Sequence, residues 1–275
     1  MKAGALLAAL MLGGCAASAT PAAAPRERPA IVSLNPCTDA ILADVADRAQ
    51  ILAISHYSQD PRSTSMDLAT ARSLRATGGS AEEVLALHPD LVLASSFTAP
   101  STLAAYRRLG LRVETFGISS TVEESEEQVR RIAALVGHSA RGDELARRIA
   151  TATKPVGGKP ITAALWQPGG IVPGAGTLVS DLLSRAGFTS YSAERGMGQG
   201  AYLSLEQVVA RPPQLLLVAG SERGQHHPVL RHLTHTTIAP FAPNLLYCGG
   251  PTIIRAMDRL RALRKKVGRS QAAVS

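Results

Sequence analysis

The sequence predicts an α/β fold of two similar lobes, and three observations lead to this prediction. Short apolar runs alternate with segments of helical periodicity, which is typical of βαβ units around a mostly parallel sheet. The alternation starts again after residue 158, and one segment of the first half recurs in the second. With 275 residues, 45% hydrophobic and 18% charged, the chain is long enough for two lobes and too apolar for disorder.

In the first half, runs of apolar and β-branched residues predict buried strands, and amphipathic spacing predicts the helices between them. The pair Asn35-Pro36 forms a turn directly after the first strand. The expected strands cover residues 30–34, 51–54, 91–94 and 111–116, and the expected helices cover 38–46, 81–88 and 101–109.

Two helices are expected between the halves. Thr121 and Glu124 have the spacing of a capping box and open a helix that runs to about Val136. The next helix runs from about Ala140 to Thr153, and a helix of about fourteen residues spans about 21 Å at 1.5 Å per residue. This second helix is the expected connector between the lobes.

The second half repeats the alternation. Its expected strands cover residues 161–166, 214–218 and 244–247, and its expected helices cover 178–186, 205–210 and 251–267. We therefore expect two Rossmann-like α/β lobes at residues 30–138 and 155–269. A single connecting helix at 139–154 joins them, and a ligand cleft lies between them.

An internal repeat carries much of this interpretation. Residues 80–93 (SAEEVLALHPDLVL) and 204–217 (SLEQVVARPPQLLL) agree at seven of fourteen positions without a gap. In each copy a Ser and an acid or amide three residues later predict a capping box, in which Glu82 and Glu206 take no part. These two carboxylates either stabilise their helices through the helix dipole or dock onto paired basic sites of a two-fold partner.

Open α/β sheets bind ligands beyond the carboxyl ends of their strands, so side chains after the strands and in Gly-rich loops are candidate ligand contacts. Trp166 and Tyr57 are the strongest candidates, because aromatic rings combine a large rigid surface with a polar tip. Trp166 would fit a core position at a strand end equally well. The full candidate set is Asn35, Cys37, Tyr57, Phe97, Trp166, Thr177, Met197, Tyr202 and Tyr247.

Residues 1–15 are predicted to be a signal peptide. A positive start precedes the apolar run 3–12, which is shorter than the roughly 20 residues that span a bilayer. The run ends in a lipobox-like Leu-Gly-Gly-Cys, so we expect Cys15 to be acylated; cleavage after Ala19 is the alternative. Residues 16–29 are rich in Ala and Pro and are expected to form a flexible tether.

Two further cysteines, Cys37 and Cys248, have two interpretations. An exported protein can join them in a disulfide. Each can also pack separately as a half-buried thiol, and the sequence favours this second interpretation because nothing in it brings the two residues together.

Other function classes find less support. The net charge of +8 allows an anionic partner, but the basic residues are spread along the chain, so nucleic-acid binding is not expected. Residues 226–235 contain four His and suggest zinc or manganese transport as an alternative. Against a metal site, residues 228–233 (PVLRHL) have the pattern of an amphipathic helix in the outer layer, and no Asp or Glu lies beside the His residues. An enzyme is not expected, because no P-loop, dinucleotide fingerprint, nucleophile elbow or HExxH motif occurs. The basic run at 255–269 is either a solvated face or a contact with anionic lipid.

Four segments occur in the order IVSLNPCTDAIL, ILAISHYS, GGSAEEVLALHPDLVLASS and LSLEQVVARPPQLLLV. Over roughly residues 30–267 this order resembles the periplasmic substrate-binding proteins of ABC importers for vitamin B12, ferric siderophores and haem. The resemblance implies two α/β lobes joined by one long helix, with the ligand between them. In that family one Glu on each lobe engages Arg residues of the membrane permease, and the matching positions are Glu82 and Glu206.

The resemblance also implies partners and a location. It predicts a periplasmic monomer, held at a membrane only through Cys15, that delivers a bulky metal chelate to an ABC permease dimer in the inner membrane. Because aromatic residues make up only 4% of the chain, a flat haem or corrin has few stacking partners, which places a ferric siderophore ahead of cobalamin. No catalytic residue, resident metal or cofactor is expected.

Overall fold

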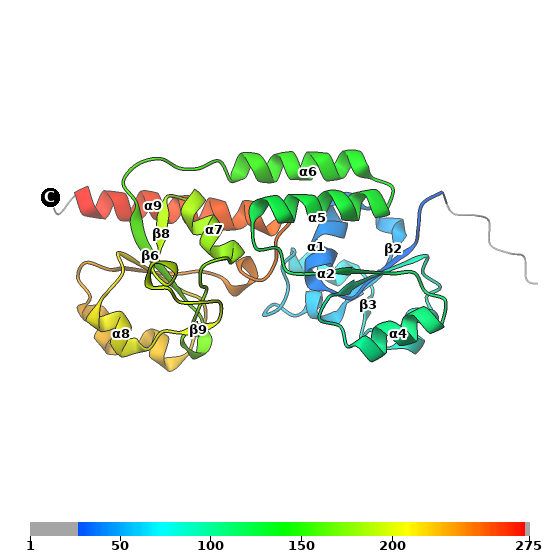
Figure 1. Ribbon diagram of the computed structural model, residues 1–275, viewed down its shortest axis with the longest axis horizontal. Coiled ribbons are helices and arrows are strands. Elements are labelled where there is room, and N and C mark those ends of the chain that lie inside the picture. The colour runs from blue at the N-terminus through cyan, green and yellow to red at the C-terminus, as the bar shows by residue number, and fades with distance from the viewer. Residues whose placement is uncertain (1–26, 273–275) are drawn as a thin grey trace, which may run out of the picture.

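The computed structural model describes residues 27–272 as two α/β lobes side by side, with long helices along one side (Figure 1). The predicted two-lobed α/β fold is confirmed. The signal peptide, Cys15 and most of the predicted tether lie outside the described residues. No helix within residues 27–272 has the length and apolar character needed to cross a membrane.

Each lobe is built on a parallel sheet. The first sheet has the order β3-β2-β1-β4-β5 and the second has the order β11-β10-β6-β8. The strands of the first sheet are β1 (Ile31–Ser33), β2 (Ile51–Ser55), β3 (Ala76–Thr77), β4 (Leu91–Ser95) and β5 (Val113–Phe116). Those of the second are β6 (Ile161–Trp166), β8 (Phe188–Ser190), β10 (Leu215–Val218) and β11 (Thr237–Pro240); β7 (Ile171–Val172) and β9 (Ala201–Tyr202) form an antiparallel pair beside it.

The predicted helices are present in the predicted order, most with ends that differ by a few residues, and α2 is a further helix that was not predicted. They are α1 (Pro36–Val45), α2 (Leu68–Ser73), α3 (Ala81–Leu85), α4 (Pro100–Arg108), α5 (Val122–Leu135), α6 (Ser139–Ala152), α7 (Leu178–Arg185), α8 (Leu205–Ala210) and α9 (Thr252–Ala272). Short 3-10 turns occur at Arg48–Gln50, His56–Gln59, Pro168–Gly170, Ala193–Arg195, Arg223–His226, Pro228–His232 and Pro243–Leu245.

The internal repeat has the same place in both lobes. In the first copy α3 leads into β4, which pairs with β1; in the second α8 leads into β10, which pairs with β6. Aligned on these strands, the sheet orders β2-β1-β4-β5 and β8-β6-β10-β11 correspond strand for strand. The sequence match therefore reflects two structurally equivalent units.

The two copies differ in how their helices begin. Ser204 and Gln207 form the predicted capping box. In the first copy Ser80 accepts the Glu83 N–H, but the Glu83 carboxylate accepts the Thr77 hydroxyl at 2.7 Å and the Gly78 N–H at 2.8 Å. The predicted capping box at Ser80 is thus incomplete, because the Glu83 side chain bonds to donors at the end of strand β3 instead of to the Ser80 N–H. Strand β3 was not predicted.

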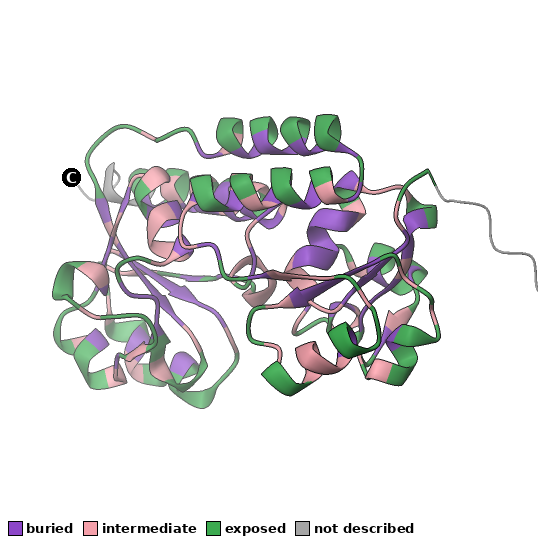
Figure 2. Cartoon of the chain, turned by 45° about the vertical axis from the view of Figure 1, so that its right-hand side comes forward, coloured by how far each residue is buried: buried purple, intermediate pink, exposed green. Residues whose placement is uncertain are grey.

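The lobes share part of one hydrophobic core. α5 and α6 pack antiparallel, and α9 lies against α6, starting beside the first lobe and ending over the second. One continuous apolar cluster includes Ile41 and Leu93 of the first lobe, Ile149 of α6, and Leu165 and Leu260 of the second lobe. Figure 2 shows the strands of both sheets buried and the outward side of α6 exposed. The connection between the lobes is therefore a packed layer of helices rather than one isolated helix.

The segment 244–247, predicted as a strand, is not one. The edge strand of the second sheet is β11, and Pro243–Leu245 form a 3-10 turn. Pro240 ends the strand and Pro243 opens the turn, and a proline cannot donate to a central strand ladder. The apolar residues that suggested a strand here pack beside the helices instead.

The basic side chains of α9 serve the fold. Arg259 donates to the Pro240 carbonyl, Arg261 donates to the Lys154 carbonyl at 3.1 Å, and Arg264 donates to carbonyls that include that of Gly187. These bonds hold the loops around the helix in place. Part of the basic face of α9, which was predicted to be solvated, therefore stabilises the fold.

Candidate ligand-binding cleft

A cavity of about 380 Å³ opens between the two lobes. The first lobe contributes Asn35, Cys37, Ser95, Phe97, residues 116–119 and Gln128; the second contributes Gln167, residues 171–173, 177–179, 199–200 and 246–249. Many of these residues follow the carboxyl ends of β1, β4, β5 and β6, where open α/β sheets hold ligands. The predicted cleft is present at the predicted edge of both sheets.

Two of the lining residues also begin helices. The Asn35 side chain accepts the Cys37 N–H at 2.9 Å and caps α1, and Thr177 Oγ1 accepts the Ser180 N–H and caps α7. Each cap orients its helix N-terminus at the cavity wall. The Thr177 hydroxyl also donates to the Gly174 carbonyl at 2.9 Å, so of these two side chains Asn35, with its amide N–H groups, has the capacity to bond a ligand.

Among residues 27–272, no charged side chain lines the cavity. Its polar groups are amides and hydroxyls, while Phe97, Ile118 and Tyr247 add exposed apolar surface at its rim. Phe97 is 75% exposed and Tyr247 is 49% exposed. An apolar wall with a few neutral polar groups suits a ligand whose enclosed part is uncharged.

The structure divides the nine candidate contacts into two groups. Asn35, Cys37, Phe97, Thr177 and Tyr247 line the cavity. Tyr57, Trp166, Met197 and Tyr202 do not belong to its lining.

Trp166 takes the second of its two expected places, a core position at a strand end. Its side chain is only 4% exposed, lies in the core of the second lobe and donates from Nε1 to the Leu203 carbonyl at 2.9 Å. The ring is therefore part of the core, and its neighbour Gln167 lines the cavity instead.

The other three candidates outside the lining lie in loops or on strand edges. Tyr202 is 63% exposed and pairs with the cavity residue Ile171 in the β7–β9 ladder. Met197 packs against the core of the second lobe. Tyr57 is exposed, and its ring lies 4.0 Å from that of His56.

Some lining residues were not predicted. Gly117, Ile118 and Ser119 directly follow β5, so the rule applied to the other strands would have included them. Gln128 comes from the middle of α5, and no sequence signal distinguishes it from the other polar side chains of that helix.

Cys37 and Cys248 form a disulfide, with Cα atoms 5.1 Å apart. The expectation of two separate thiols is therefore wrong. The partners are 211 residues apart in the chain, and only the packing of the two lobes brings them together. Both residues line the cavity.

A buried carboxylate supports the first lobe near the cleft. Asp39 Oδ2 accepts the Ser55 N–H at 3.0 Å and the Ser58 hydroxyl at 2.6 Å, which ties α1 to the 3-10 turn carrying Tyr57. Burial raises the pKa of Asp39 to about 7, although the neighbouring groups of Ser33, Ser58 and Ser55 lower it.

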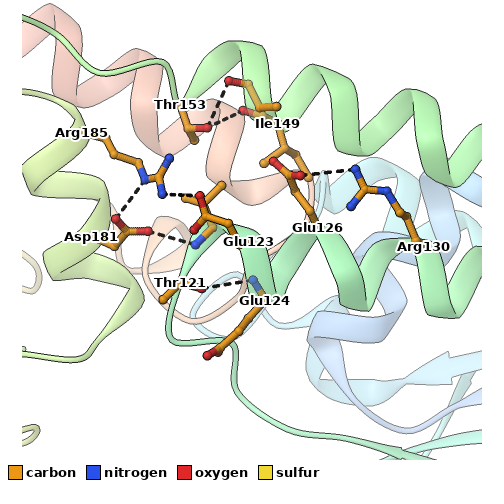
Figure 3. Close-up of polar contacts among 11 residues, drawn as sticks. Thr121, Glu123, Glu124, Glu126, Arg130, Ile149, Thr153, Asp181 and Arg185 are labelled. Atoms are coloured by element: carbon orange, nitrogen blue, oxygen red, sulfur yellow. Dashed lines mark hydrogen bonds and ion pairs between the residues drawn. The ribbon is translucent and has the colours of Figure 1, made fainter.

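A second polar contact joins the first turn of α5 to α7, as Figure 3 shows. Asp181 Oδ2 accepts the Val122 N–H at 3.0 Å, and Arg185 donates to Asp181 at 2.9 Å and to Glu123 at 2.6 Å. Because Asp181 and Arg185 lie on α7 of the second lobe, this network fixes that lobe against the helical layer.

Glu82 and Glu206 are exposed and lie in the first turns of the equivalent helices α3 and α8. Glu83, the neighbour of Glu82, instead holds Thr77 and Gly78. A bond from Ser204, together with the backbone N–H at the helix start, lowers the pKa of Glu206, so this group is anionic at neutral pH.

Nothing in the described part of the chain supports a metal-ion site. No group of three or more His, Cys, Asp or Glu there could hold a metal. The segment PVLRHL, expected as an outer helix, is a 3-10 turn, and His227 Nδ1 accepts the Val229 N–H.

A family comparison matches residues 31–235 to the periplasmic binding proteins. A search of curated protein sequences found no match.

Solved structures share the fold at low identity. The haem-binding protein HutB of Vibrio cholerae is 18% identical with a TM-score of 0.69, over 85% of this chain and 97% of that one. The vitamin B12-binding protein BtuF of Vibrio cholerae is 18% identical with a TM-score of 0.66, over 87% and 98%. The haem-binding protein RhuT of Roseiflexus sp. RS-1 is 22% identical with a TM-score of 0.64, over 86% and 97%.

Proposed function

The chain belongs to the periplasmic binding protein family, and on this premise we propose that it is the substrate-binding component of an ABC importer for a bulky metal chelate. The observation that carries the proposal is the cavity lined from both lobes at the carboxyl ends of their strands. A cavity of about 380 Å³ is within the range of small-molecule sites. Because it opens to solvent, a larger chelate can extend beyond its mouth.

The chemistry of the wall supports an uncharged chelate. A haem carries propionates and a ferric catecholate carries a net negative charge, and burying such groups without basic partners is unfavourable. The lining has no Lys, Arg or His. Its amides and hydroxyls instead match the peripheral amides of a corrinoid or the backbone of an uncharged ferric hydroxamate.

Isothermal titration calorimetry tests this proposal with four probes: cyanocobalamin, ferrichrome, ferric enterobactin and hemin. We expect one-to-one binding of cyanocobalamin or ferrichrome. Binding of the anionic probes alone would refute the uncharged-ligand proposal. Binding of none of them, together with tight zinc binding, would favour the metal-ion alternative.

Haem is the second candidate, because the Tyr247 phenol lies at the cavity wall and phenolate oxygen is a ligand for haem iron. Y247F distinguishes the two cases. If hemin binds, the variant should lose the iron–phenolate absorption and most of the affinity, whereas cobalamin or ferrichrome binding should change little.

We propose that Glu82 and Glu206 dock the protein on the permease. Their exposure and their equivalent positions in the two lobes support paired contacts with a two-fold partner. The variant E82R/E206R should lose uptake while keeping ligand affinity. E144R, at an exposed position of α6, is the control and should transport normally.

The family places the protein in the periplasm. We propose in addition that it acts as a monomer and is tethered to a membrane through acylated Cys15. The Leu-Gly-Gly-Cys sequence at the end of the apolar run supports the tether.

A further inference from the structure

The segment that precedes α9 passes between two helices of the first lobe. The Gly250 N–H donates to Ser125 Oγ at 2.7 Å. A Cβ atom at Gly249 would lie 2.3 Å from Ser125 Oγ, and one at Gly250 would lie 2.7 Å from Ile41 Cγ1. Gly250 also has φ +61, which favours glycine. Only a chain without side chains fits here, so these two residues are held tightly in the first lobe.

The same segment forms the floor of the cavity. Residues 246–249 all line it, and Cys248 is bonded to Cys37 in the first turn of α1. Cys37 is itself fixed, because its N–H donates to the Asn35 cap. The disulfide therefore joins the second half of the chain to the first lobe at the bottom of the cleft.

Upstream of Cys248 the chain is anchored by Leu245 and Leu246, which pack against the main apolar core, whereas Tyr247 is exposed. Residues 242–247 are half-buried or exposed, and Phe241 is the preceding buried residue. The backbone bonds from Leu245 to Ala242 and from Leu246 to Pro243 stay within the local turn. The position of Tyr247, which projects about half of its surface, is thus set by Leu246 on one side and by the disulfide on the other.

The start of α9 does not depend on the disulfide in the same way. Thr252 Oγ1 donates to the Ser65 carbonyl at 3.1 Å, and Arg255 donates to the same carbonyl. These bonds hold α9 against the first lobe from the other side of Gly250. Loss of the disulfide should therefore loosen the backbone around Tyr247 and Cys248 while α9 stays in place.

We propose that the Cys37–Cys248 disulfide is a positioning element of the ligand site, which holds Tyr247 and the cavity floor in their binding arrangement. The proposal rests on the proposed function, namely that this cavity binds the ligand. A loosened backbone must be ordered again on binding, so opening the disulfide should raise Kd by about 10- to 100-fold while both lobes stay folded.

The test compares wild type with C37A/C248A and with wild type reduced after folding. In the reduction, dithiothreitol gives two electrons and two protons to the disulfide, which becomes two thiols, and is itself oxidised to its cyclic disulfide. L145A, a buried truncation in α6 away from the cleft, controls for lost stability. We expect weaker binding of the chelate that calorimetry identifies in both opened forms and unchanged binding in L145A.

A double-mutant cycle with Y247A separates positioning from stability. If the disulfide acts through Tyr247, Y247A should weaken binding in the wild type and have little further effect in C37A/C248A. Wild-type affinity in both opened forms, or equal effects of Y247A in wild type and in C37A/C248A, would overturn the proposal. The disulfide would then only stabilise the fold.

Hydrogen exchange tests the structural part of the proposal without a ligand. Opening the disulfide should speed exchange at residues 244–249 and leave the amides of α1 and α9 protected. Unchanged exchange at residues 244–249 would overturn the proposal even if no chelate binds. Faster exchange there with no chelate bound by the wild type would instead contradict only the proposed function.

Discussion

Replacement of Asp39 by Asn should make the protein more stable at alkaline pH. Asp39 has no exposed surface, and its Oδ1 atom has no hydrogen-bond partner among the described residues. Burial raises its pKa from 3.8 to about 7. The ionised form is therefore disfavoured in the folded protein, while the unfolded chain ionises Asp39 freely.

The sign and size of the effect follow from linkage. Between the unfolded and folded pKa values the folded state binds more protons, so stability falls as pH rises from about 4 through about 7. At 1.36 kcal/mol per pKa unit, the ionised carboxylate costs on the order of 4 kcal/mol above that range. Asn has nearly the same shape, still accepts the Ser55 N–H and cannot ionise, so D39N should avoid this cost.

Urea unfolding of wild type and D39N at pH values from 4 to 8 measures the difference, with the disulfide intact in both proteins. The free energy of unfolding of D39N should rise steadily relative to that of wild type across this range, because the contributions of the other titrating groups are the same in both proteins. D60N, at an exposed carboxylate paired with Arg62, is the control and should show no such gain. A difference between D39N and wild type that does not change with pH would refute the reasoning.

Three further outcomes are expected. R264A should lose about 2 kcal/mol of stability, because the Arg264 guanidinium donates to three backbone carbonyls in the wild type. K265A, at an exposed position of the same helix, should lose little. Equal melting temperatures of the two variants would contradict a stabilising role of Arg264. C15S should move the protein from the membrane to the soluble fraction, and unchanged fractionation would rule out the lipid anchor. G249A should lower both the melting temperature and the ligand affinity, because its Cβ would lie 2.3 Å from Ser125 Oγ. A variant with the wild-type melting temperature and affinity would show that residues 246–249 can shift to make room for the methyl group.

The fold was largely predictable because its signals are local. Strand β6 and helix α8 have the predicted ends, since an apolar run and a capping Ser define them without help from distant residues. Short elements such as β3 and β8 were missed, because a strand of two or three residues has no periodicity and exists only through its sheet neighbours.

The candidate site was predictable only in part. The strand-end rule found Asn35 and Phe97, because it depends on chain order alone. It failed for Trp166, since strand order does not reveal which face of the last strand residue is covered; here the Leu203 carbonyl satisfies the indole N–H inside the core. The disulfide was not predictable either, because its partners meet only through the packing of the lobes.

The central claim is that one ligand is held between both lobes. Hydrogen exchange with and without the chelate identified by calorimetry tests it most directly. The account predicts simultaneous protection of residues 95–97 and 117–119 in the first lobe and 246–249 in the second, with no change on the outward side of α6. Protection confined to one lobe, or centred on residues 226–235, would contradict it.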